Sequence, residues 1–477
     1  LRSSGKQDSD RYFKIIIKYF PNRYQGYQGL ISIAKSKKQW AETVELSKDF
    51  ILRFPDMWQG YFWIGQAYKA LNQIKDAKKH FIFLTKKFSD LYQGYQGLIN
   101  IAQFEKDWEK TAELSRDFIV RFPDMWQGYF WLGKAYENSG LIEQAMETFR
   151  KLNTQFPLEK RGLEGLINIE KKNKNWYAVI DLAHELESKF NNLWLVNWLL
   201  GTSYQKLSKF DKAEESFIEL NKLYPNISKG LEGLVVLYSR MRKYTEAEVY
   251  AKELVHRFPE ESEGYYHLGN IYKINKNIEQ ASSYFKTLDY KFPHDARGVE
   301  KLITINKNSE ELINILSSKI SEFPNNWKWY WLKAQLALSL KDYENAVFEL
   351  RYLALYFPHR FESYLAFIHL EKIENNGQVS ISILENASLY FEKNKEFFKQ
   401  LSKALNLHGF YSESKEVIDI LVRNYSDSHE GLLEISKLYS EIKDWSACSL
   451  YSQKLIECFP EISQGYLLKI DALVNLG

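Results

Sequence analysis

Cysteine is almost absent from this sequence, which has only Cys448 and Cys458 among its 477 residues. Because an α-helix rises about 1.5 Å per residue, these two members of one expected helix lie roughly 15 Å apart, too far for a disulfide with each other. We therefore expect two free thiols, with Cys448 buried as a structural residue. This cysteine usage indicates a cytoplasmic location.

An excess of charge of one sign is also missing, since 64 lysines and arginines oppose 61 aspartates and glutamates. This balance gives no reason to expect binding to nucleic acid or to an anionic membrane surface. No run of about 18 consecutive apolar residues is present, so we expect no direct membrane insertion. No signal peptide is recognisable, and the chain opens at Leu1 without a methionine. We therefore expect it to be a segment of a longer protein.

The sequence also lacks recognisable catalytic motifs. It contains no G-x-x-x-x-G-K-[ST], no G-x-G-x-x-G after a strand, no H-E-x-x-H and no G-x-S-x-G. Its nine histidines are scattered, and none stands at metal-ligand spacing from another histidine or from a cysteine. We therefore expect no enzymatic activity, no cofactor and no metal.

What the sequence does contain is a regular repeat. The stretch RFPDMWQGYFW occurs at residues 53–63 and recurs unchanged at residues 121–131. An aromatic residue, usually followed by proline, recurs every 34 residues, as at Phe20, Phe54, Phe88 and Phe122. One step of 31 residues leads to Phe323, after which the period of 34 resumes. Such a period indicates an array of repeats and not a set of separate globular domains.

Within each repeat the apolar residues fall at helical spacing in two runs, which predicts two amphipathic helices. The period and its typed positions resemble the tetratricopeptide repeat, in which W-x2-L-G-x2-Y precedes A-x3-F and a proline. Residues 126–159 carry the pattern at Tyr129, Leu132, Gly133, Tyr136, Ala145, Phe149 and Pro157. The resemblance implies an all-α fold, a right-handed α-solenoid (superhelix) of helix-turn-helix units.

Counting from the proline positions divides the chain into four stretches. Residues 1–23 hold a loose end, Leu1–Asp10, and the second helix of a partial repeat. Eight regular units follow in residues 24–295, five more degenerate units in residues 296–462, and the first helix of a truncated repeat in residues 463–477. The unit at 296–326 is three residues short, and we expect the turn between its helices to be shortened.

Two types of repeat alternate along the regular part. Odd repeats carry glycine at the sixth position, at Gly29, Gly97, Gly165 and Gly233, and even repeats carry it at the eighth, at Gly65, Gly133, Gly201 and Gly269. We expect the eighth-position glycines, with alanine at the twentieth position, to let the two helices of a repeat approach closely.

The resemblance also implies a binding surface. In tetratricopeptide proteins the first helix of each repeat lines a concave groove, with its second, fifth, ninth and twelfth positions toward the ligand. The fifth positions of the even repeats are then aromatic, at Phe62, Phe130, Trp198, Tyr266 and Trp331. Amides occupy second and fifth positions in the early repeats, at Gln25, Gln28, Gln59, Gln93, Gln96 and Gln127. The alternative is that the aromatics only pack between helices.

These features favour a non-catalytic scaffold whose groove holds an extended protein segment, because amides can bind a peptide backbone. A second hypothesis is a polymer-binding arm of a larger protein for polysaccharide synthesis or export, in which sugars stack on the aromatic rings. A third is an architectural spacer without a groove ligand. Repeat folds host many functions, so the fold alone does not choose among these.

Overall fold

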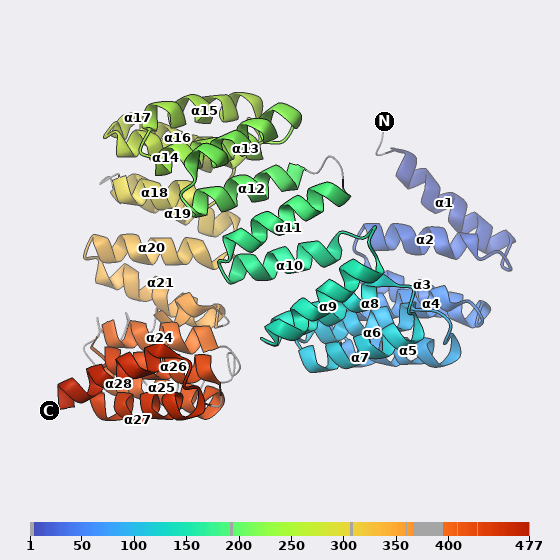
Figure 1. Cartoon of the computed structure of the whole chain (residues 1–477). Coiled ribbons are helices and arrows are strands. Elements are labelled where there is room, and N and C mark those ends of the chain that lie inside the picture. Colours follow the sequence, from blue (N-terminus) through green and yellow to red (C-terminus); the bar gives the residue numbers. More distant parts are fainter. Residues whose placement is uncertain are drawn as a thin grey trace. The chain divides into compact units, whose positions relative to one another are not determined.

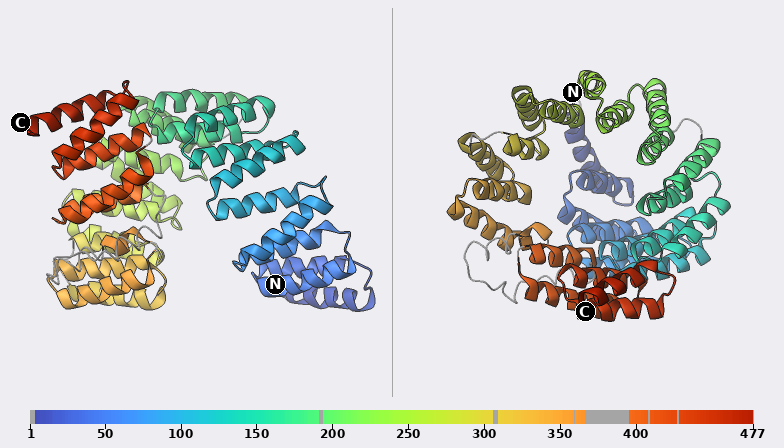
Figure 2. Two further views of the ribbon diagram at one scale, coloured as in Figure 1. Left: turned by 90° about the horizontal axis from the view of Figure 1, so that it is seen from below. Right: turned by 60° about the vertical axis from the view of Figure 1, so that its left-hand side comes forward.

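The computed structural model describes residues 4–190, 194–305, 309–358, 360–365, 395–407, 409–426 and 428–476 (Figure 1). Within these ranges all regular secondary structure is α-helical and no strand occurs. Successive helices pair in antiparallel fashion and stack in sequence order within each of two compact units (Figure 2). The all-α helical repeat solenoid predicted from the sequence is confirmed.

The first unit comprises Leu1–Met241. Its helices are α1 (Ser4–Tyr19), α2 (Gln25–Ser36), α3 (Trp40–Arg53), α4 (Trp58–Ala70), α5 (Ile74–Lys87), α6 (Gln93–Phe104), α7 (Trp108–Arg121), α8 (Trp126–Asn138), α9 (Ile142–Gln155), α10 (Arg161–Lys172), α11 (Trp176–Lys189), α12 (Trp194–Lys206), α13 (Phe210–Leu223) and α14 (Lys229–Arg240). The even-numbered helices are the first helices of the predicted repeats, and the odd-numbered ones are the second helices.

The second unit comprises Arg242–Gly477. Its described helices are α15 (Tyr244–Arg257), α16 (Ser262–Ile274), α17 (Ile278–Lys291), α18 (Arg297–Ile305), α19 (Ser309–Glu322), α20 (Trp327–Ser339), α21 (Tyr343–Tyr356), α24 (Lys395–Leu407), α25 (Tyr411–Tyr425), α26 (His429–Glu441), α27 (Trp445–Cys458) and α28 (Ser463–Leu476). Most of the predicted repeat 361–394 lies outside the described residues.

One local expectation is wrong. Helix α1 already begins at Ser4, so most of the expected loose end, Leu1–Asp10, belongs to that helix. The expected shortened turn of repeat 296–326 involves residues 306–308, which lie outside the described residues, so it stays a prediction. The predicted division at residue 296 separates regular from degenerate repeats. It differs from the boundary between the two compact units, which follows Met241, and it stays a prediction.

Each described turn between the two helices of a repeat contains one residue in the left-handed region, always at the fifteenth position. Only two of these residues are glycines, Gly140 and Gly409. The others carry side chains: Lys38, Asn72, Lys106, Lys174, Ser208, Arg242, Lys276, Lys341 and Lys443, with φ between 57° and 61°. A left-handed backbone costs an L-residue roughly 1–2 kcal/mol, so most of these turns are locally strained. The stacking of the helices must offset that cost.

The alternating glycines surround one buried phenylalanine. Phe81 of α5 is 1% exposed, and its ring lies between Gly65 of α4 and Gly97 of α6. A Cβ built on Gly65 would lie 2.8 Å from this ring, and one built on Gly97 would lie 2.2 Å from it. The same arrangement recurs around Phe149 and Phe217. The sixth-position glycine therefore admits the ring from the preceding repeat, which explains the two-repeat alternation.

Candidate functional site

The four positions implied as ligand-facing form the open side of each first helix. In α2 these are Gln25, Gln28, Ser32 and Lys35, and none of them is buried, whereas Leu30, Ile31 and Ala34 are core residues. Positions separated by three or four residues lie on one helix face, so the four side chains form a continuous row. We call the rows formed by these second, fifth, ninth and twelfth positions the inner stripe.

The first helices lie on the inner side of each unit's curvature. Backbone contacts join α4 to α6, α8 to α10 and α12 to α14 in the first unit, and α24 to α26 and α26 to α28 in the second. Among the described helices, the second helices of adjacent repeats do not approach each other as closely as these first helices do. The second helices therefore lie farther apart. Closer spacing on one side of a stack produces curvature toward that side.

All five predicted aromatic residues are half-buried. Their rings contact the core: Phe62 lies 5.9 Å from Phe81, Phe130 lies 6.4 Å from Phe149, and Trp198 lies 5.7 Å from Phe217, centroid to centroid. Trp331 packs against the cluster around Tyr330 and Ala334. These rings therefore contribute to packing between the helices of a repeat, as the alternative interpretation expects. Their use as ligand contacts stays a prediction.

Cations cover several of these rings, which the sequence analysis missed. The second-position residue of the next repeat lies over the ring in three successive even repeats. Arg161 lies 5.7 Å from the centroid of Phe130, Lys229 lies 5.6 Å from that of Trp198, and Arg297 lies 4.7 Å from that of Tyr266. Cation–π contacts of this kind contribute about 0.5–1 kcal/mol at exposed sites. The three aromatic residues recur at steps of 68 residues, and so do the three cations that lie over them. This shared step was the only sign of the contacts that these sequence positions offered.

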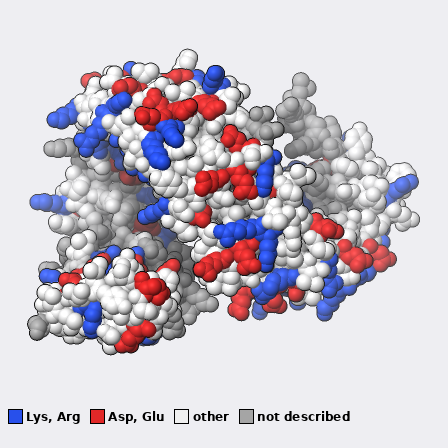
Figure 3. Space-filling view, in the orientation of Figure 1, with Lys and Arg blue, Asp and Glu red and all other residues white. Residues whose placement is uncertain are grey.

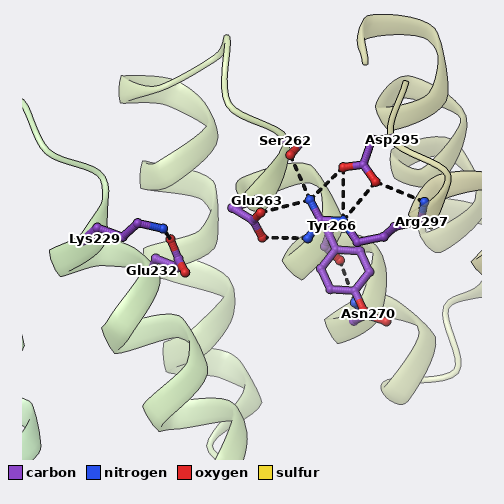
Figure 4. Close-up of polar contacts among 8 residues, drawn as sticks. All are labelled: Lys229, Glu232, Ser262, Glu263, Tyr266, Asn270, Asp295 and Arg297. Atoms are coloured by element: carbon purple, nitrogen blue, oxygen red, sulfur yellow. Dashed lines mark hydrogen bonds and ion pairs between the residues drawn. The ribbon is translucent and has the colours of Figure 1, made fainter. Parts of the chain in front are cut away.

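Arg297 is held most tightly of the three (Figure 4). Its guanidinium donates to both carboxylate oxygens of Glu263 at 2.9 Å, to Asp295 at 2.7–3.1 Å, and to the Ser262 hydroxyl at 2.9 Å. Burial alone would raise the pKa of the Asp295 carboxyl, but the hydrogen bonds from Arg297 outweigh it and lower that pKa. Asp295 and Glu263 in turn raise the pKa of Arg297 further above its ordinary value.

Lys229 of α14 and Arg161 of α10, two cations of the inner stripe, likewise lie beside carboxylates. Lys229 contacts Glu232 at 2.6 Å, and Arg161 lies 3.7 Å from Glu164. On the face that Figure 3 shows, acidic and basic side chains of the described residues are interspersed, without a large field of one sign. The charges of these later repeats therefore largely neutralise one another.

The predicted glutamines form a row in the first unit. Gln25 and Gln28 are exposed, and Gln59, Gln93, Gln96 and Gln127 are half-buried. The Oε1 atoms of Gln59, Gln93 and Gln127 are buried without a hydrogen-bond donor. The three glutamines thus share one environment, repeated at steps of 34 residues. Nothing within the described residues explains the three unpaired acceptors.

Glu137, at the twelfth position of α8, is one of two buried residues on the described part of the inner stripe, and the other is Gln205 at the same position of α12. The side chain of Glu137 is 2% exposed and contacts Lys134 at 2.8 Å, and Lys172 of α10 also donates to it. Burial by itself would raise the pKa of Glu137, but hydrogen bonds from the two lysines lower it. This carboxylate joins two neighbouring repeats and is not available to a ligand.

The described residues contain no group of three or more histidine, cysteine, aspartate or glutamate side chains that could hold a metal ion. None of the helices described is both long enough and apolar enough to span a bilayer. Cys448 is buried and Cys458 exposed, and both are free thiols. Burial raises the pKa of Cys448 to about 11, as suits an inert structural thiol.

Comparison with known proteins identifies the repeat. Residues 127–158 match one family described as Tetratricopeptide repeat, and residues 59–82 and 262–289 match another of the same description. No curated protein matches the chain.

Two solved structures resemble the chain over most of its length. One is the APC/C hetero-tetramer Cut9-Hcn1, with a TM-score of 0.34, 13% identity, and coverage of 96% of this chain and 98% of that one. The other is Naa15/Naa10 bound to HypK-THB, with a TM-score of 0.33, 10% identity, and coverage of 99% and 94%. Scores this low carry no argument about function. The family matches and the paired helices at a constant period together show that this chain is a tetratricopeptide-repeat protein.

Proposed function

We propose that the protein is a non-catalytic scaffold that binds an extended protein segment along the inner stripe. The observation that carries the proposal is the row of amides across α2, α4 and α6. A primary amide both donates and accepts hydrogen bonds, so a row of amides suits the alternating N–H and C=O groups of an extended backbone. Gln25 and Gln28 are exposed and available for such contacts.

The covered rings argue for a peptide and against a sugar polymer. Stacking of a sugar needs a free aromatic face, and the rings of Phe130, Trp198 and Tyr266 each carry a cation on one face. Their contacts with core side chains restrict access further. We therefore do not carry the polysaccharide arm forward as a second candidate. The architectural spacer is an outcome of the experiment below.

The test is photocrosslinking with a benzophenone amino acid. It is introduced at Gln28 or Gln96 on the inner stripe, and at Leu52 or Val120 as controls. Both control residues are 82% exposed on second helices. We expect adducts with a defined polypeptide from the stripe positions and none from the controls, in extracts of the native source. Adducts with a polysaccharide, or equal labelling from all four positions, would refute the proposal. If no position gives an adduct, the scaffold is refuted and the architectural spacer becomes the favoured hypothesis.

Alanine substitution of Trp198, Tyr266 and Trp331 is a poorer test, because the structure places all three rings partly in the packing between helices. Loss of binding in such variants could arise from local unfolding. A cytoplasmic location remains part of this proposal, and two free thiols suit a reducing compartment.

A further inference from the structure

The first helices of the first three regular repeats share an unusual composition. Helices α2, α4 and α6 contain no aspartate and no glutamate. Their inner stripe consists of uncharged residues and two cations, Lys35 and Lys69, which both occupy the twelfth position of their helix. The later stripe differs, since Arg161 and Lys229 there have carboxylate partners on their own helices.

Neither of these two ammonium groups is neutralised by the protein. Lys35 donates to the amide oxygen of Gln66 at 2.7 Å, and Lys69 lies 5.8 Å from the ring centroid of Phe104. Within the described residues no carboxylate lies within ion-pair distance of either one. Glu105, in the turn that follows α6, pairs with Lys78 at 2.8 Å.

Partial burial makes this arrangement unfavourable in the free protein. Both lysines are half-buried, and desolvation lowers the pKa of Lys35 and that of Lys69. A charge that has lost water without gaining a counter-charge is stabilised when an anion binds beside it. Lys35 and Lys69 occupy the same position of adjacent repeats, so a ligand with regularly spaced anionic groups could pair with both.

From this charge pattern we infer that the segment bound along α2, α4 and α6 is acidic, with side-chain carboxylates pairing with Lys35 and Lys69. The inference rests on the proposed function and names the chemistry of its ligand. Neighbouring helices pack about 10 Å apart, and an extended chain advances about 3.3 Å per residue. Carboxylates about three residues apart would therefore match the two lysines, while the glutamine amides contact the backbone between them.

The test uses labelled peptides and fluorescence anisotropy at low ionic strength. The probe repeats Glu-Gly-Ser four times and ends in an amide, so that it carries no terminal carboxylate. Matched probes replace glutamate by glutamine or by lysine, and oligothymidylate serves as a non-peptide polyanion. We expect the glutamate probe to bind most tightly, and added salt to weaken its binding.

The protein variants locate the contact. Lys35→Gln combined with Lys69→Gln should weaken binding of the glutamate probe about tenfold, as expected for the loss of two charge-assisted contacts. The matched control is Lys38→Gln with Lys75→Gln, which removes the same charge from exposed positions of the same two repeats. We expect this control to change the affinity by less than about twofold, because exposed charges contribute little. Arginine at positions 35 and 69 should retain binding.

The outcomes separate the inference from the proposed function. Equal binding of the glutamine or lysine probe would overturn the acidic ligand but not the scaffold. Equal losses in the Lys35/Lys69 variant and its control, tighter binding of oligothymidylate, or no binding of the glutamate probe would also overturn it. The scaffold itself is tested by the crosslinking experiment, where it fails if the stripe positions give no polypeptide adduct or label no more than the control positions do.

Discussion

Replacement of Gly97 by alanine tests the explanation of the alternating glycines. In an unobstructed helix, glycine to alanine stabilises by about 1 kcal/mol, because alanine has the higher helix propensity. Here the added Cβ would lie 2.2–2.5 Å from three carbons of the Phe81 ring. The ring cannot withdraw, since its other side is held by Gly65, where a Cβ would lie 2.8 Å away.

Overpacking of a filled core costs about 1–3 kcal/mol, and contacts this short place Gly97→Ala at the upper end. After subtraction of the gain in helix propensity, we expect a net destabilisation of about 2 kcal/mol. Because each repeat contributes its own stability, the loss should concentrate in the neighbouring helices. The assay is native-state hydrogen exchange of the amides in α5 and α6, with urea unfolding alongside.

Two comparisons control this measurement. At Gly465 the nearest atoms to an added Cβ are side-chain carbons of Leu455 and Ile456 at 3.2–3.3 Å, so Gly465→Ala should stay within about 0.5 kcal/mol of the parent. Phe81→Leu removes the ring atoms, so combining it with Gly97→Ala should cost about 1 kcal/mol less than the two separate changes. An unchanged or increased stability of Gly97→Ala would refute the explanation.

Three further predictions concern other parts of the chain. Lys106→Gly, at a φ of 57°, should stabilise the protein by about 0.5–1 kcal/mol in urea unfolding, because glycine adopts the left-handed backbone without steric cost. The pKa of buried Glu137 is lowered in the folded state, so its stabilising effect is present above the ordinary glutamate value of 4.5 and is lost as the pH falls below it. In the Glu137→Gln variant the free energy of unfolding should therefore fall less steeply than in the parent chain as the pH is lowered below this value. Iodoacetamide near neutral pH should modify exposed Cys458 and spare buried Cys448, as peptide mass spectrometry would detect; modification of both at equal rates would contradict the burial.

The sequence by itself determined the period, the paired helices and the residues that fill the core. These are local properties, since apolar spacing and a terminating proline act within one repeat. The same reasoning placed Cys448 in the core, where the structure has it. The family resemblance, and not local spacing, implied that the amides of the early first helices face a ligand, which stays a prediction. The repeat pattern also predicted a close approach of the two helices of a repeat at the eighth-position glycines. The phenylalanine that lies between these glycines and the sixth-position ones is identified only by the structure.

Only the tertiary structure decided how side chains of different repeats meet. The contact of Arg161 with Phe130, and of Arg297 with Tyr266, joins residues 31 positions apart and depends on the stacking of successive repeats. Whether Lys35 and Lys69 have counter-charges depends likewise on every helix around them. Composition counts charges along the chain, whereas desolvation and pairing depend on their distances in space, and the repeat stack sets those distances.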